Sequence, residues 1–305
     1  MKTYSPFKFL LGVLGIINSH DVPPTYSACP TQLEVIGAGL SKTGTQSTKI
    51  AFETLGYKVY NVESMMYYGH LDLVTSIYTS QGDEKQAYVE ELHHKILETG
   101  STVVLDIPCN FLFEELHQLS PHAKVLLSVR DSSEKWLNSI QRTFHAFAPL
   151  VTWPYSFFFD IETYSRMIWF EECTQDIDIW EPWFFPWVKI AHRYYMEDPE
   201  FCRTMYDKHN QHVIRNTDPD LLTIYNVKQG WQPLLDMLNM TRLDDNISFP
   251  QVNVGTDMDS IAFFMRLFAY IYPLLFVLIG FVCFCCTYIL IFMFWFSCVI
   301  LMKTP

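Results

Sequence analysis

Residues 33–49 read Leu33-Glu-Val-Ile-Gly-Ala-Gly-Leu-Ser-Lys-Thr-Gly-Thr-Gln-Ser-Thr-Lys49, and this stretch decides the fold. The apolar residues 33–38 predict a short buried strand, residues 39–45 predict a tight loop, and residues 46–55 predict a helix that ends at Gly56. In a strand–loop–helix unit of this kind, backbone N–H groups point into the loop and the helix N-terminus adds partial positive charge. The stretch therefore predicts an anion-binding loop.

The spacing of the loop glycines excludes two common nucleotide-binding motifs. The dinucleotide fingerprint GxGxxG would require glycine at position 42, where the chain has Lys42. A Walker A loop ends in Gly-Lys-Ser/Thr, whereas here the lysine comes two residues before Gly44, which is followed by Thr45. The loop is therefore expected to be a different class of anion-binding turn, and the alternative is an ordinary turn between a strand and a helix.

The residues that follow alternate short apolar runs with segments of helical spacing. Strands are expected at 57–62, 102–107, 123–129 and 221–227, and helices at 86–98, 111–119, 132–147, 201–214 and 231–238. This alternation predicts an α/β domain over residues 31–255, a three-layer parallel sheet flanked by helices. Ligands of such sheets bind at the carboxyl ends of the strands. The loop at 39–45, Asp106 and Arg130 all fall at such ends.

Further motifs follow in a fixed order along the domain. They are Asp106-Ile-Pro108, Val129-Arg130-Asp131, Tyr206-Asp-Lys-His209-Asn210, Tyr225-Asn-Val-Lys228-Gln-Gly230-Trp231, and Phe249-Pro-Gln-Val-Asn253. With the loop, they resemble a sulfotransferase-like family that is widespread in animals, fungi, plants and bacteria and has a P-loop nucleotide-hydrolase-like fold. The chain differs from many members in having Lys42 for Arg, Gln46 for Thr and Leu235 for Cys, and none of these differences removes a charge that the chemistry needs.

The resemblance implies a donor, 3′-phosphoadenylyl sulfate (PAPS), and a role for each matching residue. Lys42 would neutralise the leaving phosphate as a catalytic residue, and Asp106 would be the general base. The 5′-phosphosulfate would be bound by the loop residues Ser41, Lys42, Thr43, Gly44, Thr45, Gln46 and Ser47. Arg130 would hold the 3′-phosphate together with Ser139 or Asn138, of which we favour Ser139. Lys228 and Trp231 would flank the nucleotide. Two structural alternatives stay open: Arg130 could pair with Asp131, and Asp106 could be a turn residue before Pro108.

Composition limits the partners of the chain. The net charge of −12 over 305 residues argues against a nucleic-acid polymer, and the scattered cysteines show no metal-ligand spacing. Residues 267–302 contain no charged side chain, and this predicts a transmembrane anchor at 261–303 in the lipid bilayer, formed by one long helix or a hairpin. Residues 1–30 are a lead-in whose apolar part is a short signal or anchor, or a strand or helix packed on the core.

The stretch at 149–197 is rich in tryptophan and phenylalanine. It is either a cap that lines a pocket for the sulfuryl acceptor, or an aromatic surface at a membrane interface, or plain core. The sequence as a whole predicts a membrane-anchored sulfotransferase without a metal, which acts on an unidentified hydroxyl or amine. We favour a cytosolic over a lumenal domain because the N-terminal apolar run is short. The alternatives are a catalytically silent nucleotide-binding protein of the same fold and, less favoured, an ATP-dependent kinase.

Overall fold

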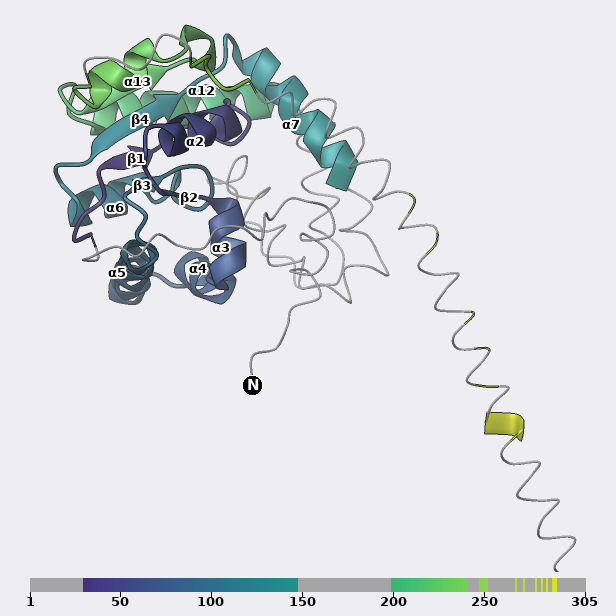
Figure 1. The fold of residues 1–305 in the computed structure, drawn as a ribbon. Coiled ribbons are helices and arrows are strands. Elements are labelled where there is room, and N and C mark those ends of the chain that lie inside the picture. The colour runs from purple at the N-terminus through teal and green to yellow at the C-terminus, as the bar shows by residue number, and fades with distance from the viewer. Residues whose placement is uncertain are drawn as a thin grey trace, which may run out of the picture.

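The computed structural model describes residues 30–147, 199–240 and 247–251, together with eight positions between 267 and 289. Five short parallel strands form one sheet in the order β2-β3-β1-β4-β5 (Figure 1). The strands are β1 (Val35–Gly37), β2 (Val59–Tyr60), β3 (Val103–Val104), β4 (Lys124–Ser128) and β5 (Leu222–Tyr225). The predicted parallel α/β sheet is therefore confirmed, with β1, the strand of the anion loop, at its centre.

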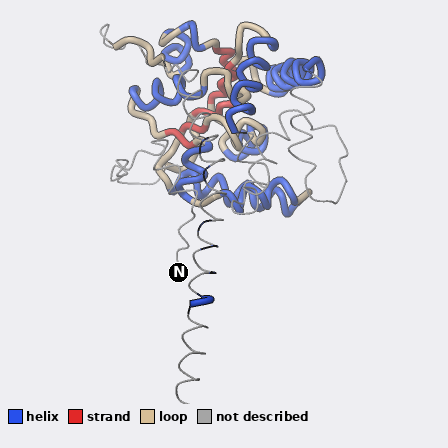
Figure 2. Tube along the Cα trace, turned by 90° about the vertical axis from the view of Figure 1, so that its right-hand side faces the viewer, coloured by secondary structure: helices blue, strands red, loops and turns tan. Residues whose placement is uncertain are grey.

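Helices surround this sheet, and the strands run through the middle of the molecule between them (Figure 2). Before β4 they are α2 (Thr45–Thr54), α3 (Val62–Tyr68), α4 (Leu71–Thr79), α5 (Gly82–Glu98) and α6 (Phe113–Leu119). After β4 come α7 (Ser133–Phe147), α12 (Pro199–Asn216), the 3₁₀ turn η4 (Val227–Gln229) and α13 (Gln232–Met237).

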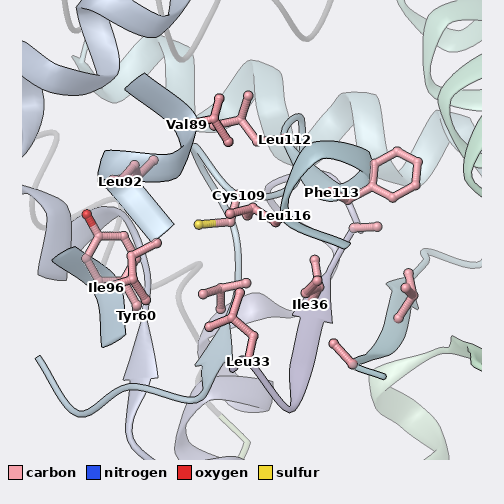
Figure 3. Close-up of a cluster of buried hydrophobic side chains, with 14 of the residues drawn as sticks. Leu33, Ile36, Tyr60, Val89, Leu92, Ile96, Cys109, Leu112, Phe113 and Leu116 are labelled. Carbon is pink, nitrogen blue, oxygen red and sulfur yellow. The ribbon is translucent and has the colours of Figure 1, made fainter. Parts of the chain in front are cut away.

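Alternate residues of each strand enter two separate cores, as the two-residue period of a strand requires. Val35, Val59 and Val103 pack with Phe52 of α2 and Leu234 of α13 on one face of the sheet. Their neighbours Ile36, Tyr60 and Val104 pack on the other face with α4, α5 and α6. Figure 3 shows this second core, in which Val89, Leu92 and Ile96 of α5 meet Leu112, Phe113 and Leu116. The two cores fix the strand ends at which the candidate site lies.

The sequence did not predict α3 and α4. Their signals are local: Asn61 caps α3 by accepting a hydrogen bond from the backbone N–H of Ser64, and Gly69 ends it in a left-handed conformation. Both helices are shorter than three turns, so their apolar residues give too few periods to stand out. The predicted strands were also too long, since each extends one to three residues beyond the observed strand at either end.

The expectations for the termini and the cap fall largely outside the described residues. The lead-in at 1–29, the aromatic stretch at 149–197 and most of the segment at 261–303 are among them. The eight described positions of the last segment are helical. Within the described residues, no helix combines the length and the apolar character that a bilayer crossing requires. The C-terminal anchor therefore stays a prediction without structural support.

Candidate functional site

The topology creates one favoured place for a ligand. From β1 the chain moves towards β2 and β3, whereas from β4 it moves in the opposite direction, towards β5. The crevice outside the carboxyl ends of β1 and β4 is therefore the switch point at which doubly wound sheets bind ligands. The anion loop follows β1, and Arg130 comes two residues after the end of β4.

Two glycines allow the loop to lie this close to its neighbours. A Cβ on Gly39 would lie 2.1 Å from the Ser128 hydroxyl oxygen and 2.5 Å from the Ser128 carbonyl oxygen. Gly44 has φ of +102°, and a Cβ there would lie 2.9 Å from the Cβ of Val227. Position 39 therefore packs the loop against β4, and position 44 packs it against the segment that follows β5.

The helix α2 begins directly after this loop with no side-chain cap. Gly44 is its N-cap residue and makes no side-chain hydrogen bond to the first turn. The first N–H groups of a helix have no partner within the helix, and they carry its partial positive charge. The loop and the start of α2 together therefore offer a row of backbone donors to an anion.

Asp106 connects the two ends of the loop. Its carboxylate accepts hydrogen bonds from the Ser41 hydroxyl and, at 3.1 Å, from the Thr45 hydroxyl, and it also accepts one from the backbone N–H of Ile107 at 2.9 Å. Asp106 and Lys42 both have left-handed backbone conformations, with φ of 64° and 68°. Non-glycine residues adopt this region rarely, and such residues gather at functional sites. The two residues that were expected to be catalytic are thus two of the three such residues in the described chain.

The hydroxyl of Thr43 is used within the protein. It donates to the carbonyl oxygen of Leu40 at 2.6 Å and lies 2.6 Å from the Ser128 hydroxyl. The Thr43 side chain is fully buried. Thr43 therefore contributes its backbone to the loop, while its side chain fixes the loop on β4.

Arg130 and Lys42 are in direct contact although they lie 88 positions apart in the chain. Nε of Arg130 donates to the carbonyl oxygen of Lys42 at 2.5 Å, and the Arg130 backbone N–H donates to the Tyr206 hydroxyl at 2.8 Å. Burial lowers the pKa of Arg130, while the charges of Tyr206 and Asp131 oppose this shift. An arginine stays protonated in proteins. The end of β4 therefore presents a fixed cation beside the anion loop.

Helix α7 fastens the loop from the same side. The fully buried Trp136 donates from Nε1 to the Ser41 carbonyl oxygen at 2.9 Å, and its ring stacks on Tyr206 with centroids 4.8 Å apart. Ser139 lies three residues after Trp136 and is half-buried, so it shares the helix face that meets the loop. Asn138, the other candidate in this helix, is exposed.

Lys228 and Trp231 have partners within the protein. Nζ of Lys228 pairs with the Asp131 carboxylate, which Lys135 and Asn226 also contact. Hydrogen bonds from Lys135, Lys228 and Asn226 hold the pKa of Asp131 well below its usual range. This network joins the ends of β4 and β5. Asp131 thus has three hydrogen-bond donors other than its neighbour Arg130.

Trp231 lies at the start of α13 and is half-buried. Its indole N–H donates to the Ile247 carbonyl oxygen at 3.0 Å, and its ring meets Phe249 edge-on with centroids 5.2 Å apart. The indole is therefore held by residues 247–251. A nucleotide would have to contact one of the faces or edges of the ring that these residues leave open.

The side chains of Gln46 and Lys49 are held by Glu63 of α3. Its two carboxylate oxygens accept from Gln46 Nε2 at 2.7 Å and from Lys49 Nζ at 2.6 Å. Gln46 therefore contributes its backbone N–H to the start of α2, while Ser47, which comes next, is buried.

The structure thus brings the loop residues 41–47, Asp106 and Arg130 into one site and places Ser139 on the adjoining helix face. The sequence pointed to none of the residues that support this site, namely Trp136, Ser128 and Glu63. A lone tryptophan or glutamate carries no spacing signal, so only the fold identifies them. No group of three or more His, Cys, Asp or Glu side chains suited to a metal ion occurs in the described part of the chain.

Comparison with known proteins covers the same elements. The model of a family described as "Sulfotransferase domain" matches residues 34–258, well over half of the chain. The chain is also similar to the Ava biosynthesis cluster protein M of Aspergillus versicolor, with 28% identity over 210 residues, which are 68% of this chain and 76% of that protein. The matched range begins one residue before β1 and includes every residue of the site described above.

Proposed function

Since the chain belongs to the sulfotransferase domain family, we propose that it transfers a sulfuryl group from PAPS to a hydroxyl or amine of a second substrate. The observation that carries this proposal is the bond between Arg130 and the Lys42 carbonyl oxygen. It places the Arg130 guanidinium, after β4, at the backbone of Lys42, after β1, so that both cationic residues belong to one end of the sheet. A donor with phosphate groups at its 3′ and 5′ positions would meet a cation at each end.

The loop would bind the 5′ end of PAPS through its backbone. The N–H groups of residues 43–46, at the start of α2, would donate to the phosphosulfate, and the hydroxyls of Thr45 and Ser47 would bind the 5′-phosphate. The Lys42 ammonium would lie on the oxygen that bridges phosphorus and sulfur. The negative charge that grows on the leaving phosphate is best stabilised there, and fixed charges at such a position supply much of the rate of group transfer. The 3′-phosphate would lie between Arg130 and Ser139.

In the transfer step, the oxygen or nitrogen of the second substrate forms a bond to sulfur as the bridging S–O bond breaks. The bonding electrons leave with adenosine 3′,5′-bisphosphate, and the proton of the attacking group must go to a base. We assign this proton to Asp106. One of its oxygens holds the Thr45 hydroxyl in the unliganded chain. A rotation of Thr45 towards the bound phosphate would release that oxygen for the proton.

Transfer of ³⁵S from labelled PAPS tests the proposal, with the full-length chain and a panel of phenols, sterols and aminosugars. The variants Lys42→Met and Arg130→Met should each lower kcat/KM by at least a hundredfold. Lys124→Met, which removes a cation at the opposite end of β4, should stay within twofold of the wild type. Full activity in either site variant would refute the site, and ³²P transfer from ATP would favour the kinase alternative.

We further propose that residues 261–303 anchor the protein in a membrane, with the α/β domain in the cytosol. The support is the run at 267–302, which lacks charged residues and is bounded by Arg266 and Lys303. The full chain should stay in the membrane pellet after extraction at alkaline pH. Protease added outside sealed microsomes should digest the domain, and the sequons at Asn239 and Asn246 should stay unglycosylated. Release into the supernatant would refute the anchor, and protection with glycosylation would place the domain in the lumen.

A further inference from the structure

A groove of about 830 Å³ runs along α12 beside the candidate donor site. Its walls come from the exposed side of α12, from residues 110–113 at the start of α6, and from Leu40 of the anion loop. Its volume falls in the range of small-molecule sites, which span about 300–1,000 Å³. Nothing in the donor site as described above uses this groove.

Two hydrogen bonds connect the groove to the reacting end of the donor site. His209, which lines the groove, contacts the Ala38 carbonyl oxygen through Nε2 at 2.7 Å, directly after β1. Asn110, on the opposite wall, donates its backbone N–H to the Asp106 carbonyl oxygen at 3.1 Å. The groove therefore adjoins the backbone at the end of β1 and the backbone of the residue that we assign as the base.

The Asn110 side chain is the feature that indicates a ligand. It is fully buried, it lines the groove, and neither its Nδ2 nor its Oδ1 has a hydrogen-bond partner among the described residues. A buried amide without partners is costly, and native proteins keep one mainly where something else satisfies it. An amide offers one donor group and one acceptor group side by side. Its natural complement is a group that also carries both, such as a carboxamide.

The rest of the groove combines apolar side chains with charged ones. Leu40, Phe111, Phe113 and Met205 supply apolar surface, and the Phe111 ring meets His209 edge-on with centroids 6.0 Å apart. Burial lowers the pKa of His209 against the opposing effect of its bond to Ala38, while Asp207, Lys208 and Arg215 bring charges of both signs to the same wall. The groove therefore offers apolar surface to a ring and polar or charged partners to the substituents of that ring.

We propose that this groove is the site of the sulfuryl acceptor, and that the acceptor is a low-molecular-weight ring compound with a hydroxyl group and a neighbouring carboxamide or lactam. The proposal rests on the sulfotransferase function given above. In this proposal, Asn110 recognises the amide, and the aromatic wall of Phe111 and Phe113 packs against the ring. The hydroxyl that receives the sulfuryl group lies on the loop side of the groove.

The test uses salicylamide (2-hydroxybenzamide) as the probe, in saturation-transfer NMR titrations on the full-length protein in detergent. Salicylamide should bind the wild type, and phenol should bind at least tenfold more weakly. Asn110→Leu, of similar volume, should weaken salicylamide at least tenfold and leave the Kd of adenosine 3′,5′-bisphosphate within twofold. Thr204→Trp fills the groove from an exposed position and should do the same, whereas the matched exposed change Thr54→Trp on α2 should not.

The outcomes separate the two proposals. If the wild type binds the bisphosphate but not salicylamide, or if Asn110→Leu and Thr204→Trp bind salicylamide like the wild type, the groove assignment is overturned. If salicylamide binding follows the predicted pattern and the bisphosphate does not bind, the groove assignment stands as a ligand site and the donor assignment falls.

Discussion

Replacing Gly44 by alanine should damage the donor site more than the same change at Gly56, although both glycines have left-handed backbones. Gly44 precedes α2 with φ of +102°, and Gly56 follows it with φ of +91°. A Cβ at position 56 has open space around it. A Cβ at position 44 would lie 2.9, 3.0 and 3.2 Å from three carbon atoms of Val227. The pair thus separates the cost of the backbone conformation from the cost of crowding the loop.

The expected magnitudes follow from these two terms. An L-residue in the left-handed region costs about 1–2 kcal/mol, and both variants share this cost. Contacts near 3 Å must open by several tenths of an ångström, and such overpacking adds about 1–3 kcal/mol. We expect Gly56→Ala to lose about 1–2 kcal/mol of unfolding free energy and Gly44→Ala about 2–5 kcal/mol. Because the loop itself has to move, only Gly44→Ala should also lose affinity for adenosine 3′,5′-bisphosphate, by at least tenfold.

Urea unfolding and isothermal titration calorimetry measure the two quantities on the same samples. The variant Val227→Gly removes the atoms that a Cβ at position 44 would meet. In a double-mutant cycle, Gly44→Ala and Val227→Gly should therefore show a coupling of about 1–3 kcal/mol in the stabilising direction. The reasoning is refuted if Gly44→Ala binds the bisphosphate like the wild type, or if the cycle shows no coupling.

Three further predictions concern the supports of the loop. Thr43→Val should lower the unfolding free energy by about 1–3 kcal/mol, measured in urea, because it leaves the buried partners of the hydroxyl unsatisfied. Trp136→Phe keeps an aromatic ring beside Tyr206 but removes the bond to Ser41, so bisphosphate affinity should fall in calorimetry while the conservative Trp231→Phe should have a smaller effect. Burial lowers the pKa of His209 in the folded chain, so the unfolded chain takes up the proton first as the pH falls. Stability should be complete above the unfolded pKa of about 6.5 and should fall as the pH drops through it, and His209→Gln should make this fall shallower.

The central part of the fold could be predicted from the sequence because its signals are local. The strand–loop–helix unit at residues 33–55 has one periodicity change and one glycine-bearing turn, and the structure forms it with β1 at 35–37 and α2 at 45–54. The contact between Arg130 and Lys42 was also foreseeable, because both residues follow buried parallel strands that end at the same edge.

The supports of the site could not be predicted, because they depend on which side chains the fold brings together. Asp106 was weighed as a base or as a turn residue. Its carboxylate in fact accepts hydrogen bonds from Ser41 and Thr45, which lie 65 and 61 positions earlier in the chain, and no spacing rule suggests these contacts. Lys228 was expected to flank the nucleotide, and its pairing with Asp131 depends on the adjacency of β4 and β5. No sequence pattern indicates Asn110, because what distinguishes it is a buried side-chain amide without hydrogen-bond partners among the described residues.

The most direct test of the account compares three nucleotides by calorimetry on the full-length wild type and Arg130→Met. The account predicts that adenosine 3′,5′-bisphosphate binds the wild type at least tenfold more tightly than 5′-AMP or Mg²⁺–ATP. It also predicts that Arg130→Met loses this preference for the 3′-phosphate. Equal or tighter binding of Mg²⁺–ATP by the wild type, or an unchanged preference in Arg130→Met, would contradict it.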